Sequence, residues 1–359
     1  MENNILIEQK ILELRNELKT DRLDMSFGEI INIYEEGDLI IRPEYQRAFR
    51  WSNEQKTRFI ESIILGIPIP PIFVAEDEKG KWELVDGLQR ISTILSFFGK
   101  LRIEDVEKAH KLNLFKLEET DLLGNLIKNL NVNDLTPKLR NTIKRAVCRV
   151  EILRWDSQID MRYELFNRLN TGASPLTAQE LRNCIYIGKF NTFLQKLAKY
   201  ENFKKIIRPT DYQLERMFLE EMVLRYFAII KEYKNWYLTK DIKHYLDDFM
   251  RDVTKDKIFI EYDIEENKFY KICDFFANYS KPFNAKNKKF SASIYETLMF
   301  VAHYYYDYYI EKNNTIKFKD RKNKLLKDEK FQKFAGHQTS QKERLKKKLE
   351  RAKEIFDVG

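Results

Sequence analysis

The segment 52–99 constrains the fold of this chain more than any other, because a helix, two strands and a second helix follow one another there. Ser-Asn-Glu-Gln at 52–55 is a capping-box sequence, and the helix that it opens is stopped by Gly66 and the prolines that follow. Strand-like patterns then occupy 72–76 and 81–86, separated by the turn Asp-Glu-Lys-Gly. This order predicts two strands joined by a tight turn and flanked by helices.

Weaker patterns predict the remaining elements. Helical spacing of apolar residues predicts a helix over 1–20, and a short apolar run predicts an extended segment over 38–42. A third strand is expected at 147–153, where apolar residues alternate with Arg149 and Glu151. Residues 101–145 are polar with a mostly helical pattern.

Two domains are expected from the change of pattern along the 359 residues. Residues 1–185 mix helices and strands, and residues 186–359 are nearly all helical in pattern. The segments 215–231 and 293–309 are apolar over much of their circumference, which predicts core helices. The expected fold class is therefore α+β, with an all-helical C-terminal domain.

The net charge of +8 is concentrated near the C-terminal end. Residues 311–359 carry 16 Lys or Arg and 8 Asp or Glu, so the rest of the chain is balanced. A basic segment of this kind can bind the phosphate backbone of DNA. The candidate contacts are Lys346, Lys347 and Lys348. The alternative is a solvated helix, whose apolar residues would be Leu345, Leu349, Ala352 and Ile355. The sequence leaves both interpretations open.

The positions of the cysteines and histidines argue against disulfides and zinc sites. Three cysteines far apart form neither a disulfide framework nor a CxxC site, so we expect a cytoplasmic protein. The four histidines are also far apart, which predicts no zinc site. No apolar stretch is long enough to predict a membrane span.

The hexapeptide Val-Asp-Gly-Leu-Gln-Arg, at 85–90, is the first candidate site. A strand that ends at Asp86-Gly87 before a helix can aim backbone N–H groups at an anion, and Arg90 could grip phosphate oxygens. Asp86 could orient a water or hold a metal that bridges phosphates, and Gln89 could position a nucleophile. The alternative needs no ligand: Asp86 as N-cap with Gln89 three residues later would form a capping box.

Two further stretches are rich in polar and aromatic side chains. Tyr45, Phe49 and Trp51 are interleaved with Gln46, Arg47 and Arg50, a cluster that suits a base or a sugar phosphate but also suits a core boundary. In 166–172, Asn167, Arg168, Asn170 and Thr171 precede Gly172, and they would suit a ribose or a phosphate, or simply end a helix.

Taken together, these stretches resemble a known family. "IRPEYQRAFRW", "ESIILGIPIPP", "VDGLQR" and "FNRLNTGASPLTAQELRN" occur in the order and at the separations of the N-terminal domain of GmrSD-type, modification-dependent restriction endonucleases. That domain has a ParB/sulfiredoxin-like fold, so the resemblance implies this fold for the first domain. It covers roughly residues 25–185.

The resemblance implies a nucleotide site that binds an NTP, with Mg²⁺ as a candidate metal. It assigns catalysis to Asp86, Gln89 and Arg90. It assigns nucleotide binding to Gln46, Arg47, Gly87, Arg90, Arg168 and Asn170. The family sequence Asp-Gly-Gln-Gln-Arg is broken here, because Leu88 replaces the first glutamine and cannot hydrogen-bond a nucleotide or a water. Phosphate binding is expected to survive this change, whereas turnover is expected to be slow or absent.

The resemblance also bears on partners. Family members that cut DNA usually carry a His-Asn-His nuclease domain, which this sequence does not show. We therefore expect an NTP-binding and NTP-hydrolysing regulatory or DNA-engaging subunit of a restriction or anti-phage system, that is, a nucleoside triphosphatase linked to a DNA endonuclease. DNA and a nuclease protein are the expected partners, and the oligomeric state stays open. The alternatives are a non-catalytic nucleic-acid-binding module and a self-sufficient ParB-like nuclease.

Overall fold

The fold is described from a computed structural model of the chain. The structure describes residues 2–17, 19–41, 51–102, 106–157, 164–165, 168, 176–186, 188–232, 241–285, 289–335 and 341–358. The chain divides into two compact units, Met1–Pro175 and Leu176–Gly359, and each is described by itself.

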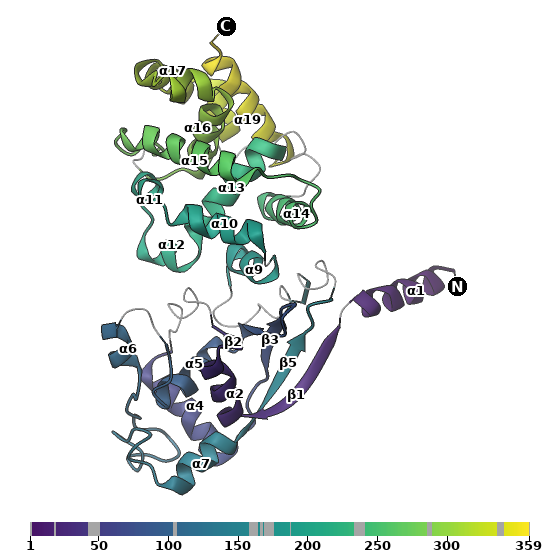
Figure 1. The fold of residues 1–359 in the computed structure, drawn as a ribbon, viewed down its shortest axis with the longest axis vertical. Helices are drawn as coiled ribbons and strands as arrows, with labels where there is room; N and C mark the ends of the chain where they lie inside the picture. Colours follow the sequence, from purple (N-terminus) through teal and green to yellow (C-terminus); the bar gives the residue numbers. More distant parts are fainter. Residues whose placement is uncertain are drawn as a thin grey trace. The chain divides into compact units, whose positions relative to one another are not determined.

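A five-stranded sheet forms the centre of the first unit (Figure 1). Its strands are β1 (Thr20–Ser26), β2 (Leu39–Ile40), β3 (Ile72–Glu76), β4 (Trp82–Asp86) and β5 (Val147–Leu153), in the order β1-β5-β3-β4-β2. The predicted strand pair β3–β4 is antiparallel, and β1 pairs antiparallel with β5. The pairs β3–β5 and β2–β4 are parallel. Strands β3, β4 and β5 confirm the sequence prediction.

The helices of the first unit pack mainly on one face of this sheet. They are α1 (Glu2–Glu17), α2 (Phe27–Glu36), α4 (Asn53–Leu65), α5 (Leu88–Phe97), α6 (Val106–Leu112) and α7 (Pro137–Arg145). Figure 1 shows α2, α4, α5 and α7 gathered on the same side. The predicted capping box opens α4, with reciprocal bonds between Ser52 and Gln55. Phe27 and Phe59 are buried with their rings 6.2 Å apart, which joins α2 to α4.

Two predictions for this unit need correction, and one strand was missed. Strand β1 was not predicted, because it contains few apolar residues and most of its side chains are exposed. The helical pattern of 101–145 forms only α6 and α7 among the described residues, with turns between them. Side chains add to the backbone bonds of these turns: Glu61 accepts from the hydroxyl of Thr120 and the backbone N–H of Leu123. The expected 38–42 strand is the two-residue β2.

The second unit is built from helices in the part of it that the structure describes. They are α9 (Ala178–Ile185), α10 (Lys189–Ala198), α11 (Glu201–Ile207), α12 (Asp211–Glu215), α13 (Phe218–Glu232), α14 (Ile242–Thr254), α15 (Tyr262–Ala277), α16 (Ala292–Tyr304), the π-helical turn η2 (Asp307–Glu311), α17 (Thr315–Lys327), α18 (Glu329–Ala335) and α19 (Gln341–Phe356). Helices α13 and α16 are largely buried, as the sequence predicts for core helices. The α+β class with a helical C-terminal region is confirmed.

A buried arginine explains why the division falls after Pro175 rather than after residue 185. Arg182 on α9 is 1% exposed, and its Nε lies 2.7 Å from Asp247 Oδ1 on α14. The same guanidinium donates to the backbone carbonyl of Lys243 and lies 3.8 Å from Glu221 on α13. A buried cation needs such partners, so α9 is held within the second unit.

A second group of buried charges ties α19 to this unit. Glu296 on α16 lies 2.7 Å from both Arg225 Nη1 and Lys348 Nζ, and Lys348 is only 4% exposed. Arg225 also pairs with Glu221 at 2.8 Å, which connects this group to Arg182. Burial would raise the pKa of Glu296, but Lys348 and Arg225 outweigh it and hold this pKa below its ordinary value.

This placement corrects the expectation that Lys348 contacts DNA. Its ammonium is committed to Glu296 and Ser293 inside the protein, and a phosphate could reach it only if that pairing were broken. The apolar residues predicted for a solvated helix are all buried: Leu345, Leu349, Ala352 and Ile355. Lys347 is exposed and Lys346 is half-buried, so their role in DNA binding stays a prediction.

Glu296→Gln is expected to destabilise the chain strongly, because it removes the carboxylate that Lys348 and Arg225 share and leaves only Arg225 with its second ion pair, to Glu221. Breaking a buried ion pair costs about 3–5 kcal/mol of unfolding free energy. Glu350→Gln on the exposed side of α19 is the matched control and should change it by less than about 0.5 kcal/mol. Urea unfolding followed by circular dichroism measures both, and equal effects would contradict a stabilising role for the buried group.

Candidate functional site

The turn between β4 and α5 is the structural centre of the candidate site. Asp86 ends the strand, and Gly87 occupies the N-cap position of α5 with φ +99° and no side chain to cap the helix. The capping box considered for Asp86 and Gln89 is therefore not formed. The first turn of α5 keeps N–H groups for which its cap supplies no side-chain acceptor, and these carry the positive end of the helix dipole.

Backbone conformation and packing within the protein explain why position 87 is a glycine. Its backbone lies in the left-handed region, where a Cβ is strained. A Cβ there would also lie 2.5 Å from Cγ2 and 2.9 Å from Cβ of Ile72 on β3. Close packing between β3 and the start of α5 thus requires a glycine before any ligand is considered.

Arg90 joins three segments at this turn. Its Nη2 donates to Asp86 Oδ2 at 2.8 Å and to the backbone carbonyl of Pro71 at 3.0 Å. The Arg90 side chain is 17% exposed, whereas that of Asp86 is 52% exposed. The guanidinium therefore fixes the geometry of the turn, and the Asp86 carboxylate faces solvent beside it.

Gln89 connects the turn to the end of the stretch 42–51. Its Oε1 accepts from the backbone N–H of Trp51 at 3.1 Å, and the Trp51 ring packs against Phe59 with centroids 5.5 Å apart. Strand β2 runs parallel to β4, so the chain reaches Ile41 at the same end of the sheet as Asp86. Trp51, which follows 42–50, is thus bonded at the candidate site, whereas Ile41, which precedes this segment, is placed only at the same end of the sheet.

The remaining predicted residues are less well placed. Gln46, Arg47 and Asn170 lie outside the described residues. Arg168 is 81% exposed, and its Nε is 3.3 Å from Glu164 Oε2 within its own segment. Their convergence on the turn therefore stays a prediction.

The later part of the fourth family-like stretch has a structural role in the second unit. The predicted capping box of Thr177 and Glu180 opens α9. Arg182 belongs to the buried ion pairs described above, and the backbone carbonyl of Asn183 accepts from the amide of Asn191. These side chains are internal, so they do not extend the site.

Two neighbours of the turn were not anticipated from the sequence. One is the Pro71 carbonyl, which belongs to the proline-rich segment before β3 and carries no side-chain signal. The other is Cys148 on β5, whose alternation pattern predicts only burial. Burial raises the pKa of the Cys148 thiol to about 11 despite the nearby positive charge of Arg90. The thiol is therefore protonated near neutral pH and is a poor nucleophile.

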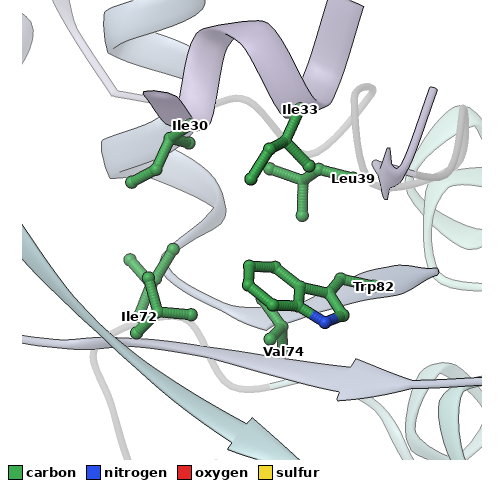
Figure 2. A pocket seen from close by; sticks show the side chains of 7 residues that line it. Ile30, Ile33, Leu39, Ile72, Val74 and Trp82 are labelled. Atoms are coloured by element: carbon green, nitrogen blue, oxygen red, sulfur yellow. The ribbon is translucent and has the colours of Figure 1, made fainter. Parts of the chain in front are cut away.

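The pocket in Figure 2 is a separate feature with a different chemistry. It lies between α2, β2 and the sheet. Its lining residues are Ile30, Ile33, Leu39, Ile72, Val74, Trp82 and Val150. No carboxylate, amine or hydroxyl lines it, so it is suited to packing and not to a phosphate.

The part of the chain that the structure describes contains neither a metal-ligand cluster nor a membrane-spanning helix. No group of three His, Cys, Asp or Glu side chains there is placed to hold a metal ion. No helix within the same ranges is long and apolar enough to cross a membrane. At the turn itself Asp86 is the carboxylate beside Arg90, so a magnesium ion would need phosphate oxygens as further ligands.

Comparison with known families gives one similarity. Residues 27–187 match the family model described as GmrSD restriction endonuclease, N-terminal domain. The match begins at α2, contains β2 to β5 and the candidate site, and ends just after α9. Neither the curated proteins nor the solved structures gave a match.

Gly87→Ala is expected to destabilise the first unit more than Gly37→Ala. Both glycines have positive φ, so both substitutions incur left-handed strain of roughly 1–2 kcal/mol. At Gly37 a Cβ meets nothing within 4 Å, whereas at Gly87 it meets Ile72. Thermal unfolding of the two variants compares them, and equal losses would show that Ile72 does not crowd this position.

Proposed function

Residues 27–187 match the model of the GmrSD restriction endonuclease N-terminal domain family, and from this premise we propose that the chain is a nucleotide-binding component of a DNA restriction or defence system. In this proposal the first unit binds a nucleoside triphosphate, and the chain engages DNA. Cleavage of DNA is carried out by a partner nuclease.

The observation that carries the proposal is the convergence of three family-like stretches at the start of α5. Trp51 from the first stretch bonds Gln89, the Pro71 carbonyl from the second bonds Arg90, and Asp86 and Arg90 from the third pair with each other. Arg90 has a structural role, but the turn also exposes half of the Asp86 carboxylate beside a helix N-terminus that lacks a side-chain cap. A triphosphate fits that combination, because it is an anion that binds N–H groups, guanidinium and, through Mg²⁺, carboxylate.

Each residue has a distinct role in the proposed site. The N–H groups of the first turn and Arg90 hold phosphate oxygens, and Gly87 keeps the backbone in the conformation that presents them. A guanidinium has five N–H donors, so donors remain beyond the Nη2 atom that bonds Asp86 and Pro71. Asp86 orients a water or contacts Mg²⁺, and Gln89 positions a nucleophile or the nucleotide. The residues proposed to complete the pocket are Gln46, Arg47, Arg168 and Asn170.

Hydrolysis is proposed to be slow. Leu88 is the first residue of α5 and stands where the family pattern has glutamine. An aliphatic side chain can neither accept from nor donate to an attacking water. The nucleotide would then act mainly as a bound signal, and turnover by Asp86, Gln89 and Arg90 would be limited by the missing amide.

A second candidate function is a non-catalytic nucleic-acid-binding module. The observation that favours it is the excess positive charge of 311–359, of which Lys347 is exposed on α19 and several lysines are exposed on α17. The two functions are compatible in one chain, because the charge lies in the second unit and the nucleotide turn in the first.

Nucleotide binding is tested by titration calorimetry of the full chain with ATP, GTP, CTP and UTP in the presence of Mg²⁺. At least one of them should bind, and Arg90→Gln should weaken it by about 1.5–3 kcal/mol, roughly ten- to a hundred-fold. Lys79→Gln removes an equal charge from the exposed β3–β4 turn and should leave the affinity unchanged. Wild-type protein that binds none of the four nucleotides would reject the proposal, and a thermal scan checks that Arg90→Gln stays folded.

DNA binding is tested with the double variant Lys346→Gln, Lys347→Gln. If both lysines neutralise phosphates, the slope of log affinity against log salt should become less steep by about 0.9 for each. Lys348→Gln is the contrasting variant, because its side chain is internal and its loss should lower stability more than it changes the slope. Fluorescence anisotropy with a labelled duplex measures the slopes, and an unchanged slope in the double variant would remove α19 from the DNA surface.

A further inference from the structure

The sheet of the first unit has an open edge at β1. Figure 1 shows β1 as the outermost strand beside β5, and no strand pairs its other side within the described part of the chain. Residues 20–24 are exposed and the last two residues of the strand are half-buried. An open edge presents N–H and C=O groups that another strand can pair with. We propose that β1 pairs antiparallel with β1 of a second copy of this chain, about a two-fold axis at Leu23.

The backbone directions in β1 fit this register. The Lys19 carbonyl accepts from Arg154 at 3.0 Å, and the Phe27 N–H donates to Ala146 at 3.1 Å, so the odd-numbered residues face β5. Backbone groups alternate in direction along a strand, so the even-numbered residues face outward. An axis at Leu23 then sets Arg22 opposite Asp24 of the second copy as a hydrogen-bonded pair. Thr20 and Ser26 form the next such pairs.

The charges of β1 are self-complementary in the same register. Within one copy, Arg22 Nε lies 2.9 Å from Glu151 Oε2, and Arg149 Nε lies 2.9 Å from Asp24 Oδ1. Across the axis, Arg22 would meet Asp24 of the second copy, so charges along each row of the joined sheet alternate in sign. A parallel, in-register pairing would set Arg22 against itself and Asp24 against itself, which disfavours it.

The charges of Arg22 and Asp24 also favour a second β1 over other strands as the pairing partner. Charged residues on an edge strand normally discourage pairing with foreign strands. Here they discourage strands that lack the matching pattern and admit a second β1 in one register. Leu23, which is 44% exposed, would meet its own copy at the axis and lose that exposure. Strand β1 lies before residues 27–187, so this feature belongs to the chain outside its family match.

Sedimentation equilibrium of the full chain tests the pairing through charge reversal. The wild-type chain should form dimers, and Arg22→Asp or Asp24→Arg alone should raise the dimer Kd about tenfold or more, because each sets like charges opposite each other twice. An equimolar mixture of the two variants should regain the dimer as a heterodimer, since opposite charges then meet at both positions. Lys79→Asp carries the same charge change as Arg22→Asp, lies in the exposed β3–β4 turn, and should dimerise like the wild type.

A cross-link supplies a second readout that does not depend on charge. Residues at a non-hydrogen-bonded antiparallel pair have Cα atoms about 4.5 Å apart, within the range of a disulfide. Leu23→Cys should therefore form a disulfide-linked dimer under mild oxidation, with the wild-type chain as the control for its own cysteines. A wild type that stays monomeric, a dimer unaffected by either reversal, or a mixture of the two variants that stays monomeric would each overturn the proposal.

Discussion

The guanidinium of Arg90 is the interaction on which the candidate site depends. One nitrogen bonds both the end of β4, through Asp86, and the start of β3, through the Pro71 carbonyl. Ile72 can then pack against Gly87, and α5 can begin directly after the strand. The hydrogen bond from Trp51 to Gln89 joins the end of the first family-like stretch to the same place. Arg90 therefore builds the turn and, in the proposed function, also binds the ligand of that turn.

Because Arg90 has both a structural role and a proposed ligand-binding role, the effects of its substitution need careful interpretation. A lost Arg90 removes a proposed phosphate ligand and also leaves the Pro71 carbonyl without this donor. Only a comparison of binding and stability in the same variant separates the two effects. Asp86 is more informative in this respect, because its carboxylate is half exposed, and the Arg90 guanidinium keeps its bond to the Pro71 carbonyl when this carboxylate is replaced.

The sequence predicted the elements whose signals are local. The capping boxes at Ser52 and Thr177, the β3–β4 strand pair and the core helices α13 and α16 follow from spacing and turn residues, and they were found. The exposed β1 was missed because its order comes from pairing with β5 rather than from apolar residues of its own. At the site, the sequence also allowed a capping box with Asp86 as the N-cap residue of α5. The N-cap residue is instead Gly87, one position later, and the Asp86 carboxylate pairs with Arg90.

In the second unit, the three adjacent lysines of α19 also show what sequence alone could not predict, namely a partner that is distant in the chain. Three adjacent lysines look equivalent in the sequence, but successive helical residues point about 100° apart. Lys348 follows Leu345 by three residues and precedes Ala352 by four, so it shares their buried face and needs Glu296 as a partner. The sequence spacing is enough to predict that Lys348 lies on the buried face of α19. It is not enough to identify its partner Glu296, which lies 52 residues away in the chain.

Amide hydrogen exchange shows whether a nucleotide binds at the start of α5, because the N–H groups of this turn are its proposed ligands. Exchange of the first-turn amides of α5 is compared with and without saturating nucleotide and Mg²⁺. Slower exchange is expected at residues 88–90, because phosphate oxygens would accept from these N–H groups, and also at Trp51, whose N–H bonds Gln89 of the same turn. Nucleotide binding that leaves these amides unchanged while protecting another part of the chain would contradict it.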